Sequence, residues 1–207
     1  MRNRFGIQIV VALGIAALFA AATIRTRNPA LPNIGDVGKA LTGVLILVAL
    51  YERFLWRLIP APIWRLIPAP RPPRLYGTWK MLLKPEKGPE GASLDEKSCY
   101  LSVDQTASKI SARILFADGE SKATTAVLGK DRHGDEHLLL FYDYVPKKQT
   151  AKDPTRKGAV ALRITEGALN GEYWNDFGIS GDLTSSGRTP KKKYKEYKDA
   201  LLEGNYT

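Results

Sequence analysis

The 207-residue sequence predicts an all-β domain, an eight-stranded antiparallel up-and-down barrel, preceded by a hairpin of two transmembrane helices. Two observations lead to this fold class. Residues 5–24 form a run of twenty uncharged residues near the start of the chain. After Leu75, apolar and polar residues alternate between frequent turn residues, as in half-buried β-strands. We therefore divide the chain into a helical hairpin at residues 1–59, a spacer at 60–74 and a barrel domain at 75–207.

The run at residues 5–24 has the length of a transmembrane helix. At about 1.5 Å of rise per residue it reaches about 30 Å, the thickness of a bilayer's hydrocarbon core. Ala12, Ala16 and Ala20 recur at every fourth position, a small-residue ridge where a second helix can approach closely. The alternative is a cleaved signal peptide, since arginines precede the run and alanines near its end resemble a cleavage site. Its apolar part exceeds the ~7–15 residues usual in signal peptides, which favours the anchor.

A second apolar run, at residues 40–51, predicts the second helix of the hairpin. Twelve residues are too few to span a bilayer, but the helix can extend back towards Ile34 and onwards through Trp56. The alternative is a buried helix in a soluble core. Seven arginines flank the outer ends of the predicted hairpin, against three basic residues in its loop. This excess predicts that both termini and the barrel are cytoplasmic.

Residues 60–74 are expected to form a stiff, extended spacer between membrane and barrel. The unit Trp-Arg-Leu-Ile-Pro-Ala-Pro occurs at residues 56–62 and again at 64–70. Its indole and guanidinium groups suit the membrane interface, and its prolines stop a helix. Further prolines follow, so the segment is expected to be semi-rigid.

The net charge of +10 belongs mainly to the membrane-flanking part of the chain. Residues 1–74 carry ten Lys or Arg and two Asp or Glu, whereas residues 75–207 carry twenty-one and nineteen. A nearly neutral barrel gives little electrostatic support for DNA or RNA binding. Cys99 is the single cysteine, so no intramolecular disulfide can form.

Eight short strands separated by turn residues are predicted to build the barrel. They cover residues 76–84, 98–105, 109–117, 121–130, 136–145, 158–165, 168–175 and 179–186. Short links imply an antiparallel meander, and closure removes the exposed sheet edges. An eight-stranded barrel is just wide enough for side chains or one small ligand. Residues 190–202 are predicted to form a basic helix that packs on or plugs the barrel, with Tyr194, Tyr197 and Leu201 on one face.

No catalytic arrangement is predicted, and we expect neither enzyme activity nor a cofactor. The sequence contains no nucleophile elbow, P-loop, Cys-x-x-Cys or dinucleotide-binding glycine motif. His133 and His137 lie close in sequence to Asp135 and Glu136, which invites a metal site. A hairpin turn at Gly134 is the simpler explanation, and we predict no metal.

Aromatic and polar side chains on the strands are the candidates for a ligand site. Because strand residues alternate between two faces, Tyr142 shares a face with Tyr144, and Tyr173 shares one with Asn175. Aromatic rings can stack on bases, while cations and amides can bind phosphates. Ordinary filling of the barrel is the alternative. The predicted ligand-binding residues are Trp79, Tyr142, Arg163, Tyr173, Asn175 and Thr184.

Two loops are long or charged enough to take part in binding. Residues 85–97 are rich in Pro, Gly and charge. Loops of this length in compact domains are often lids or disordered. A basic loop can meet phosphates or lipid headgroups, although a solvated charge run is the commoner explanation. Its cations are Lys147, Lys148, Lys152, Arg156 and Lys157.

Three short motifs accompany this order of parts: Tyr-Gly-Thr-Trp at residues 76–79, Leu-Asn-Gly-Glu-Tyr-Trp-Asn at 169–175 and Gly-Ile-Ser-Gly-Asp-Leu at 178–183. The combination shows a resemblance to the SMODS-associating two-transmembrane β-strand-rich (S-2TMβ) effectors of bacterial CBASS anti-phage systems. It covers the whole architecture, and its matching Trp79 and Tyr173, with Asn175, guide the choice of ligand-binding residues.

The resemblance implies a lipocalin-like barrel that binds a cyclic di- or trinucleotide made by a cognate nucleotidyltransferase. Binding would drive homo-oligomerisation of the transmembrane segments and disruption of the bacterial inner membrane, killing the infected cell. The alternatives are a membrane-tethered barrel that binds a lipid or fatty acid, and a structural barrel within a membrane complex. An apolar cavity with one anchoring cation is expected of the lipid-binding alternative.

Overall fold

A computed structural model of the protein describes residues 34–58, 72–88, 94–147, 155–165, 167–190 and 192–206. The described residues belong to two compact units. One is helical, ends at Pro72 and also includes residues 106–109. The other contains the barrel and the C-terminal segment.

The helical unit contains α2 (Ile34–Leu50), followed directly by one π-helical segment, η1 (Tyr51–Leu55), and by α3 (Trp56–Leu58). The helix predicted around residues 40–51 is therefore confirmed, with its extension in both directions. Large apolar side chains on this segment are exposed, among them Leu45, Ile46, Leu47, Phe54 and Leu58.

Among the residues that the structure describes, no helix combines the length and apolar character needed to cross a membrane. The predicted first helix, with Ala12, Ala16 and Ala20, lies outside the described residues, as does the spacer up to residue 71.

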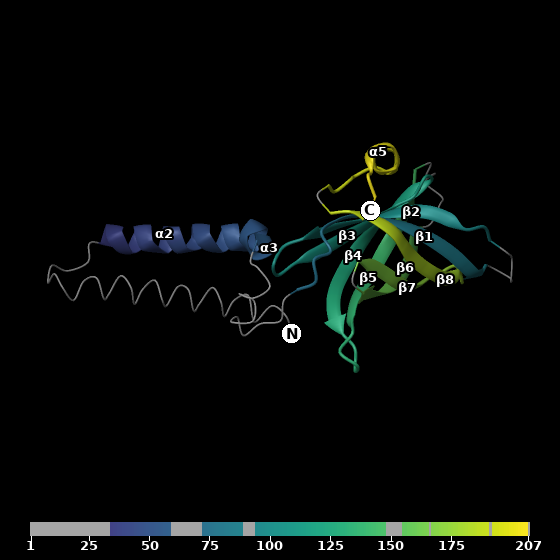
Figure 1. Cartoon of the computed structure of the whole chain (residues 1–207), viewed down its shortest axis with the longest axis horizontal. Helices are drawn as coiled ribbons and strands as arrows, with labels where there is room; N and C mark the ends of the chain where they lie inside the picture. The colour runs from purple at the N-terminus through teal and green to yellow at the C-terminus, as the bar shows by residue number, and fades with distance from the viewer. Residues whose placement is uncertain are drawn as a thin grey trace. The chain divides into compact units, whose positions relative to one another are not determined.

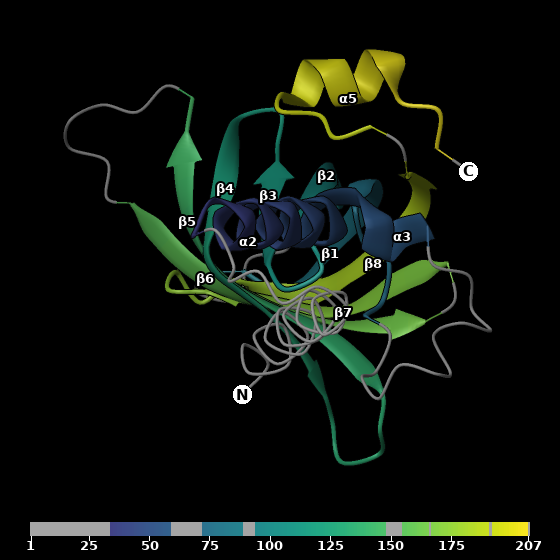
Figure 2. The same cartoon turned by 90° about the vertical axis from the view of Figure 1, so that its left-hand side faces the viewer.

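Eight strands form one antiparallel sheet that closes into a barrel (Figures 1 and 2). They are β1 (Gly77–Lys87), β2 (Lys97–Gln105), β3 (Ile110–Leu115), β4 (Gly119–Lys130), β5 (Glu136–Pro146), β6 (Arg156–Thr165), β7 (Ala168–Asn175) and β8 (Ser180–Thr189). Each strand pairs with its neighbours in sequence, and β1 pairs with β8. The predicted eight-stranded up-and-down barrel is confirmed.

Two strand ends differ most from the prediction. β1 continues past Pro85 to Lys87, and the register of its pairing with β8 shifts between these two residues. Proline has no backbone N–H to donate, so it is tolerated where the ladder is already irregular. β8 continues to Thr189, which pairs with Thr78.

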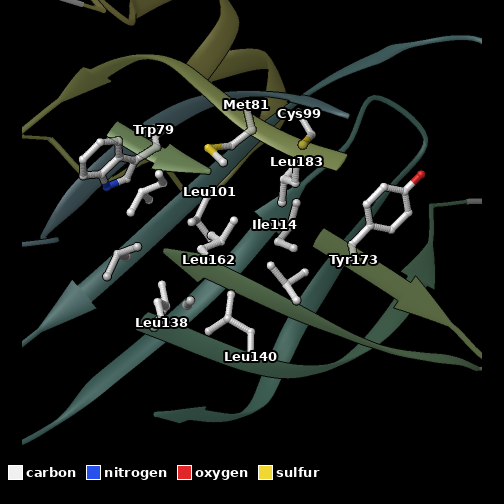
Figure 3. Close-up of a cluster of buried hydrophobic side chains, with 14 of the residues drawn as sticks. Trp79, Met81, Cys99, Leu101, Ile114, Leu138, Leu140, Leu162, Tyr173 and Leu183 are labelled. Carbon is white, nitrogen blue, oxygen red and sulfur yellow. The ribbon is translucent and has the colours of Figure 1, made fainter. Parts of the chain in front are cut away.

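Alternate side chains from the strands fill the barrel with an aliphatic core (Figure 3). In β2, Cys99, Leu101 and Val103 are fully buried. Asp104, the next residue, faces outwards, and its carboxylate binds Lys193. Each fully buried aliphatic side chain contributes about 1.5–3 kcal/mol relative to an exposed one. This alternation fixes which residues of every strand face the interior.

One end of the barrel is filled by side chains around Trp79. The Trp79 indole N–H donates to the backbone oxygen of Leu75 at 3.1 Å, and the Arg188 guanidinium lies 4.5 Å from the indole ring centre. Gln105 accepts a hydrogen bond from the Leu75 N–H and donates to the backbone oxygen of Pro73. The filled end leaves the opposite end for a ligand.

The C-terminal helix is shorter than predicted. Helix α5 spans only Tyr197–Glu203, not residues 190–202, and it lies outside the sheet near β2 (Figures 1 and 2). The hydroxyl of Thr78 in β1 donates to the backbone oxygen of Lys192 and accepts from the N–H of Tyr194. These bonds hold residues 192–194 in non-helical conformation. The helix therefore packs on the barrel, through buried Ala200, and does not plug it.

Candidate ligand cavity

A cavity of about 450 Å³ opens at the end of the barrel opposite Trp79. At this end β1, β3, β5 and β7 finish, and β2, β4, β6 and β8 begin. The volume lies within the ~300–1,000 Å³ usual for small-molecule sites. The cavity is therefore large enough for a small ligand held partly inside the barrel.

Most of the cavity wall is apolar or aromatic. Leu83 of β1 and Phe116, just beyond β3, face the cavity together with Ile179 before β8 and Leu94 before β2. Three tyrosines, Tyr142, Tyr144 and Tyr173, add broad rings to this wall. Such a lining favours a ligand with flat or apolar surfaces, oriented by a few polar contacts.

Tyr142 and Tyr144 of β5 occupy space left by glycines in neighbouring strands. Tyr142 is directly opposite Gly158 of β6. A methyl group added to Gly158 would overlap the phenol of Tyr142, and one added to Gly119 of β4 would overlap the phenol of Tyr144. The two glycines therefore determine where the two rings lie in the cavity.

The inner part of the cavity contains two buried hydroxyls, those of Tyr173 and Ser121. Tyr173 is 4 % exposed and Ser121 is 1 % exposed, yet no described residue offers either hydroxyl a hydrogen bond. In Figure 3 the Tyr173 hydroxyl points away from the aliphatic core, at the opposite side from Trp79. A buried hydroxyl left without a partner costs about 1–3 kcal/mol. A bound molecule can remove this cost by supplying the missing hydrogen bonds.

Burial also disfavours the ionised form of two of these tyrosines. It raises the pKa of Tyr173 to about 12, with a further contribution from Cys99. Burial likewise raises the pKa of Tyr142 to about 12, helped by Tyr173 and Asp176. Both phenols are therefore neutral at physiological pH and available as donors and acceptors.

Charged groups lie at the rim of the cavity rather than inside it. The Lys97 ammonium lies 3.9 Å from the Asp118 carboxylate, and both side chains are more than half exposed. The exposed Arg156 guanidinium lies 4.6 Å from the ring centre of Phe177. Burial raises the pKa of Tyr144 to about 12, and the negative charge of Asp118 contributes to the same shift. Lys97 and Arg156 can bind an anion at the rim. Lys97 has an acidic neighbour and Arg156 an aromatic one.

Three of the six predicted ligand-binding residues line this cavity: Tyr142, Tyr173 and Asn175. Asn175 also shapes the turn between β7 and β8. Its side-chain oxygen accepts hydrogen bonds from the backbone N–H groups of Phe177 and Ile179, at 3.0 and 3.1 Å. Its amide group is thus partly committed to the fold.

The other three predicted residues lie elsewhere. Trp79 belongs to the filled end of the barrel and does not line the cavity. Arg163 is exposed on the outer face of β6, where its guanidinium lies 2.6 Å from the Asp135 carboxylate. Thr184 follows buried Leu183 and faces outwards from β8. The structure therefore does not bring the six residues together in one site.

Among the cavity residues absent from the predicted six are Ser121, Tyr144, Lys97 and Arg156. The alternation of β5 already places Tyr144 on the face of Tyr142, and this signal was available in the sequence. Arg156 belongs to the predicted basic loop, of which residues 148–154 lie outside the described residues. Nothing in the local sequence around Ser121 distinguishes it from any other residue of the predicted strand at 121–130.

The predicted turn at residues 131–135 is confirmed and explains the neighbourhood of the two histidines. The Asp131 carboxylate accepts hydrogen bonds from the N–H groups of His133 and Asp135, and Gly134 has a φ of +87°. His137 Nε2 lies 3.3 Å from the same carboxylate. Within the described part of the chain, no three His, Cys, Asp or Glu side chains form a metal-binding group.

No protein-family model matches the sequence, and no curated protein matches it either. The function is therefore inferred from the cavity, from the apolar segments that precede the barrel and from the order of these parts along the chain.

Proposed function

We propose that this chain is a membrane-anchored receptor for a cyclic di- or trinucleotide and acts as an effector of a bacterial CBASS anti-phage system. The observation that carries the proposal is the cavity at the open end of the barrel. It combines three tyrosine rings, two hydroxyls that have no hydrogen-bond partner among the described residues, and a rim with Lys97 and Arg156. Rings can stack on bases, and guanidinium and ammonium groups can bind phosphates. A cyclic nucleotide offers both kinds of surface.

The membrane part of the proposal rests on the sequence of the N-terminal region. Residues 5–24 are uncharged and long enough to span a bilayer, and basic residues flank both apolar runs. In α2, Leu45 and Leu47 are more than half exposed, as side chains that contact lipid or another helix are. We place this region in the bacterial inner membrane, with both termini in the cytoplasm.

A nucleotidyltransferase encoded with this chain would supply the ligand during infection. Ligand binding would then promote homo-oligomerisation, and the packed transmembrane segments would disrupt the membrane. The ridge of Ala12, Ala16 and Ala20 is the proposed helix-packing surface, because small residues let helices approach closely.

A second candidate function is the binding of a fatty acid or another lipid. The apolar wall with Leu83, Phe116 and Ile179 favours it, since an acyl chain needs only such a surface. Lys97 or Arg156 would bind the carboxylate at the rim. The two candidates differ in whether the ligand contains hydrogen-bonding rings.

Thermal melting of the full chain in detergent micelles separates these candidates. The samples contain cyclic di- and trinucleotides or oleate, each well above its expected dissociation constant. A ligand at 100 times its dissociation constant stabilises the folded chain by about 2.7 kcal/mol, or roughly 5–10 °C for a protein of this size. A rise with a cyclic nucleotide alone supports the receptor. A rise with oleate alone supports the lipid carrier, and no rise with any cyclic nucleotide contradicts the proposed function.

Salt dependence gives an independent check on the rim. Replacement of Lys97 or Arg156 by Ala removes one phosphate contact and should make nucleotide affinity less sensitive to salt. Lys130→Ala is the matched control, because Lys130 ends β4 at the far end of the barrel and pairs with Glu136. A control variant that weakens binding as much as the rim variants would argue against phosphate binding at the rim.

A further inference from the structure

Among the described residues, the inner end of the cavity offers hydroxyl groups but no cation. The hydroxyls of Tyr173 on β7 and Ser121 on β4 both line the cavity and are both more than nine-tenths buried. Neither has a hydrogen-bond partner among the residues described. Each hydroxyl can both donate and accept, so together they can match a ligand edge with mixed donors and acceptors.

The surroundings of these hydroxyls exclude an anionic group. In the described part of the chain, the cations that line the cavity are Lys97 and Arg156, and both belong to its exposed rim. An unpaired carboxylate or phosphate at the inner end would lose its hydration without gaining a counter-ion, which is strongly unfavourable. A wholly apolar group would instead leave both hydroxyls unpartnered. The group that fits is neutral and polar.

We propose that the cavity binds its ligand base-first, with the hydrogen-bonding edge of a neutral nucleobase against Tyr173 and Ser121 and the phosphates at the rim. This inference rests on the proposed function and adds an orientation and a basis for specificity. Tyr142 and Tyr144 also line the cavity and provide rings on which the base stacks. The inner hydroxyl pair then distinguishes one base from another, because an unmatched base leaves buried polar groups unpaired.

A fatty acid fits the polar groups of the cavity poorly in either of its two orientations. With its tail inwards, the hydroxyls of Tyr173 and Ser121 stay unpartnered. With its carboxylate inwards, the charge lies away from Lys97 and Arg156. The hydroxyl pair therefore favours the nucleotide over the lipid, although the apolar wall alone suits both.

The test compares cyclic di-AMP, cyclic di-GMP and cyclic di-UMP, which share one backbone and differ only in their bases. Dissociation constants are measured by calorimetry with the full chain in detergent, for the wild type and for Tyr173→Phe and Ser121→Ala. Each variant removes one hydroxyl. We expect affinity for the preferred nucleotide to fall roughly tenfold or more, and the preference among the three to shrink. The salt dependence should stay unchanged, since no cation is removed.

Two matched variants control for general effects on folding. Tyr206→Phe removes a hydroxyl that donates to the backbone oxygen of Ala200 at 2.9 Å, outside the cavity. Ser185→Ala removes one that accepts from the N–H of Leu169 at 2.8 Å. Both controls should lower the melting temperature and leave affinity unchanged. Tyr173→Phe and Ser121→Ala should do the reverse, because they delete unpartnered hydroxyls and leave the free protein at least as stable.

The outcomes separate the orientation from the function. If a cyclic dinucleotide binds and both cavity variants bind it as tightly as the wild type, the base-first orientation is wrong and the receptor function stands. If none of the three nucleotides binds, the base-first orientation is contradicted. The wider melting panel, with its cyclic trinucleotides, then decides whether the receptor function is contradicted as well. Reduced affinity with unchanged stability in both cavity variants supports the proposal.

Discussion

Replacement of Trp79 by Phe tests whether this residue supports the fold rather than the ligand. Trp79 is 2 % exposed, its N–H donates to Leu75 O at 3.1 Å, and Arg188 lies 4.5 Å from its ring centre. Phe keeps most of the apolar surface but leaves the Leu75 oxygen unpaired and weakens the contact with Arg188. These losses amount to about 2–4 kcal/mol.

The predicted loss corresponds to a fall in melting temperature of roughly 4–16 °C for a chain of this length. Far-UV circular dichroism of the full chain in detergent measures it, and a nucleotide titration below the melting range measures affinity. Trp174→Phe is the control, because Trp174 is 46 % exposed on the outer face and should change stability by less than about 0.5 kcal/mol. Weaker ligand binding by Trp79→Phe with an unchanged melting temperature would refute the structural role.

Three further predictions follow from the cavity and the membrane region. In Gly158→Ala the added carbon should displace Tyr142 and lie 2.7 Å from the Trp174 backbone oxygen. We expect this to lower stability by about 1–3 kcal/mol and to weaken nucleotide binding measured by calorimetry. Burial raises the pKa values of Tyr142 and Tyr173 to about 12, against about 10 in the unfolded chain, so their neutral forms stabilise the fold below pH 10. The free energy of unfolding, measured by denaturant titration, should therefore decline as the pH rises from 10 to 12. Ala16→Leu should spare ligand binding but abolish toxicity in cells; undiminished killing would show that the alanine ridge is not the assembly surface.

The barrel could be predicted from the sequence because the alternation of apolar and polar residues indicates which face of a strand is buried. The same alternation indicates that Arg163, between Leu162 and Ile164, faces outwards, as does Thr184 beside Leu183. These two residues were therefore predicted as ligand contacts against a signal that the sequence contained. The same signal puts Tyr144 on the face of Tyr142, although the predicted site does not include Tyr144.

Other features depend on position along the barrel axis, which alternation does not encode. Trp79 and Tyr173 both face the interior, yet the first lies at the filled end and the second at the cavity (Figure 3). The filled end is created by contacts between Trp79 and Arg188, which are far apart in sequence. The short C-terminal helix has the same origin, because Thr78 holds residues 192–194 in a non-helical conformation.

The proposed assembly sets a thermodynamic condition on where the ligand must be exposed. A ligand favours an oligomer only if it binds the oligomer more tightly than the single chain. A ligand wholly enclosed by one barrel makes the same contacts in both forms and leaves the equilibrium unchanged. The base-first orientation avoids this difficulty, because it leaves the phosphates at the rim, beside Lys97 and Arg156, where a second chain can contact them. A shift from 1 % to 99 % assembled needs about 5.5 kcal/mol of differential binding, which two or three charge-assisted hydrogen bonds of about 1.5–3 kcal/mol each can supply.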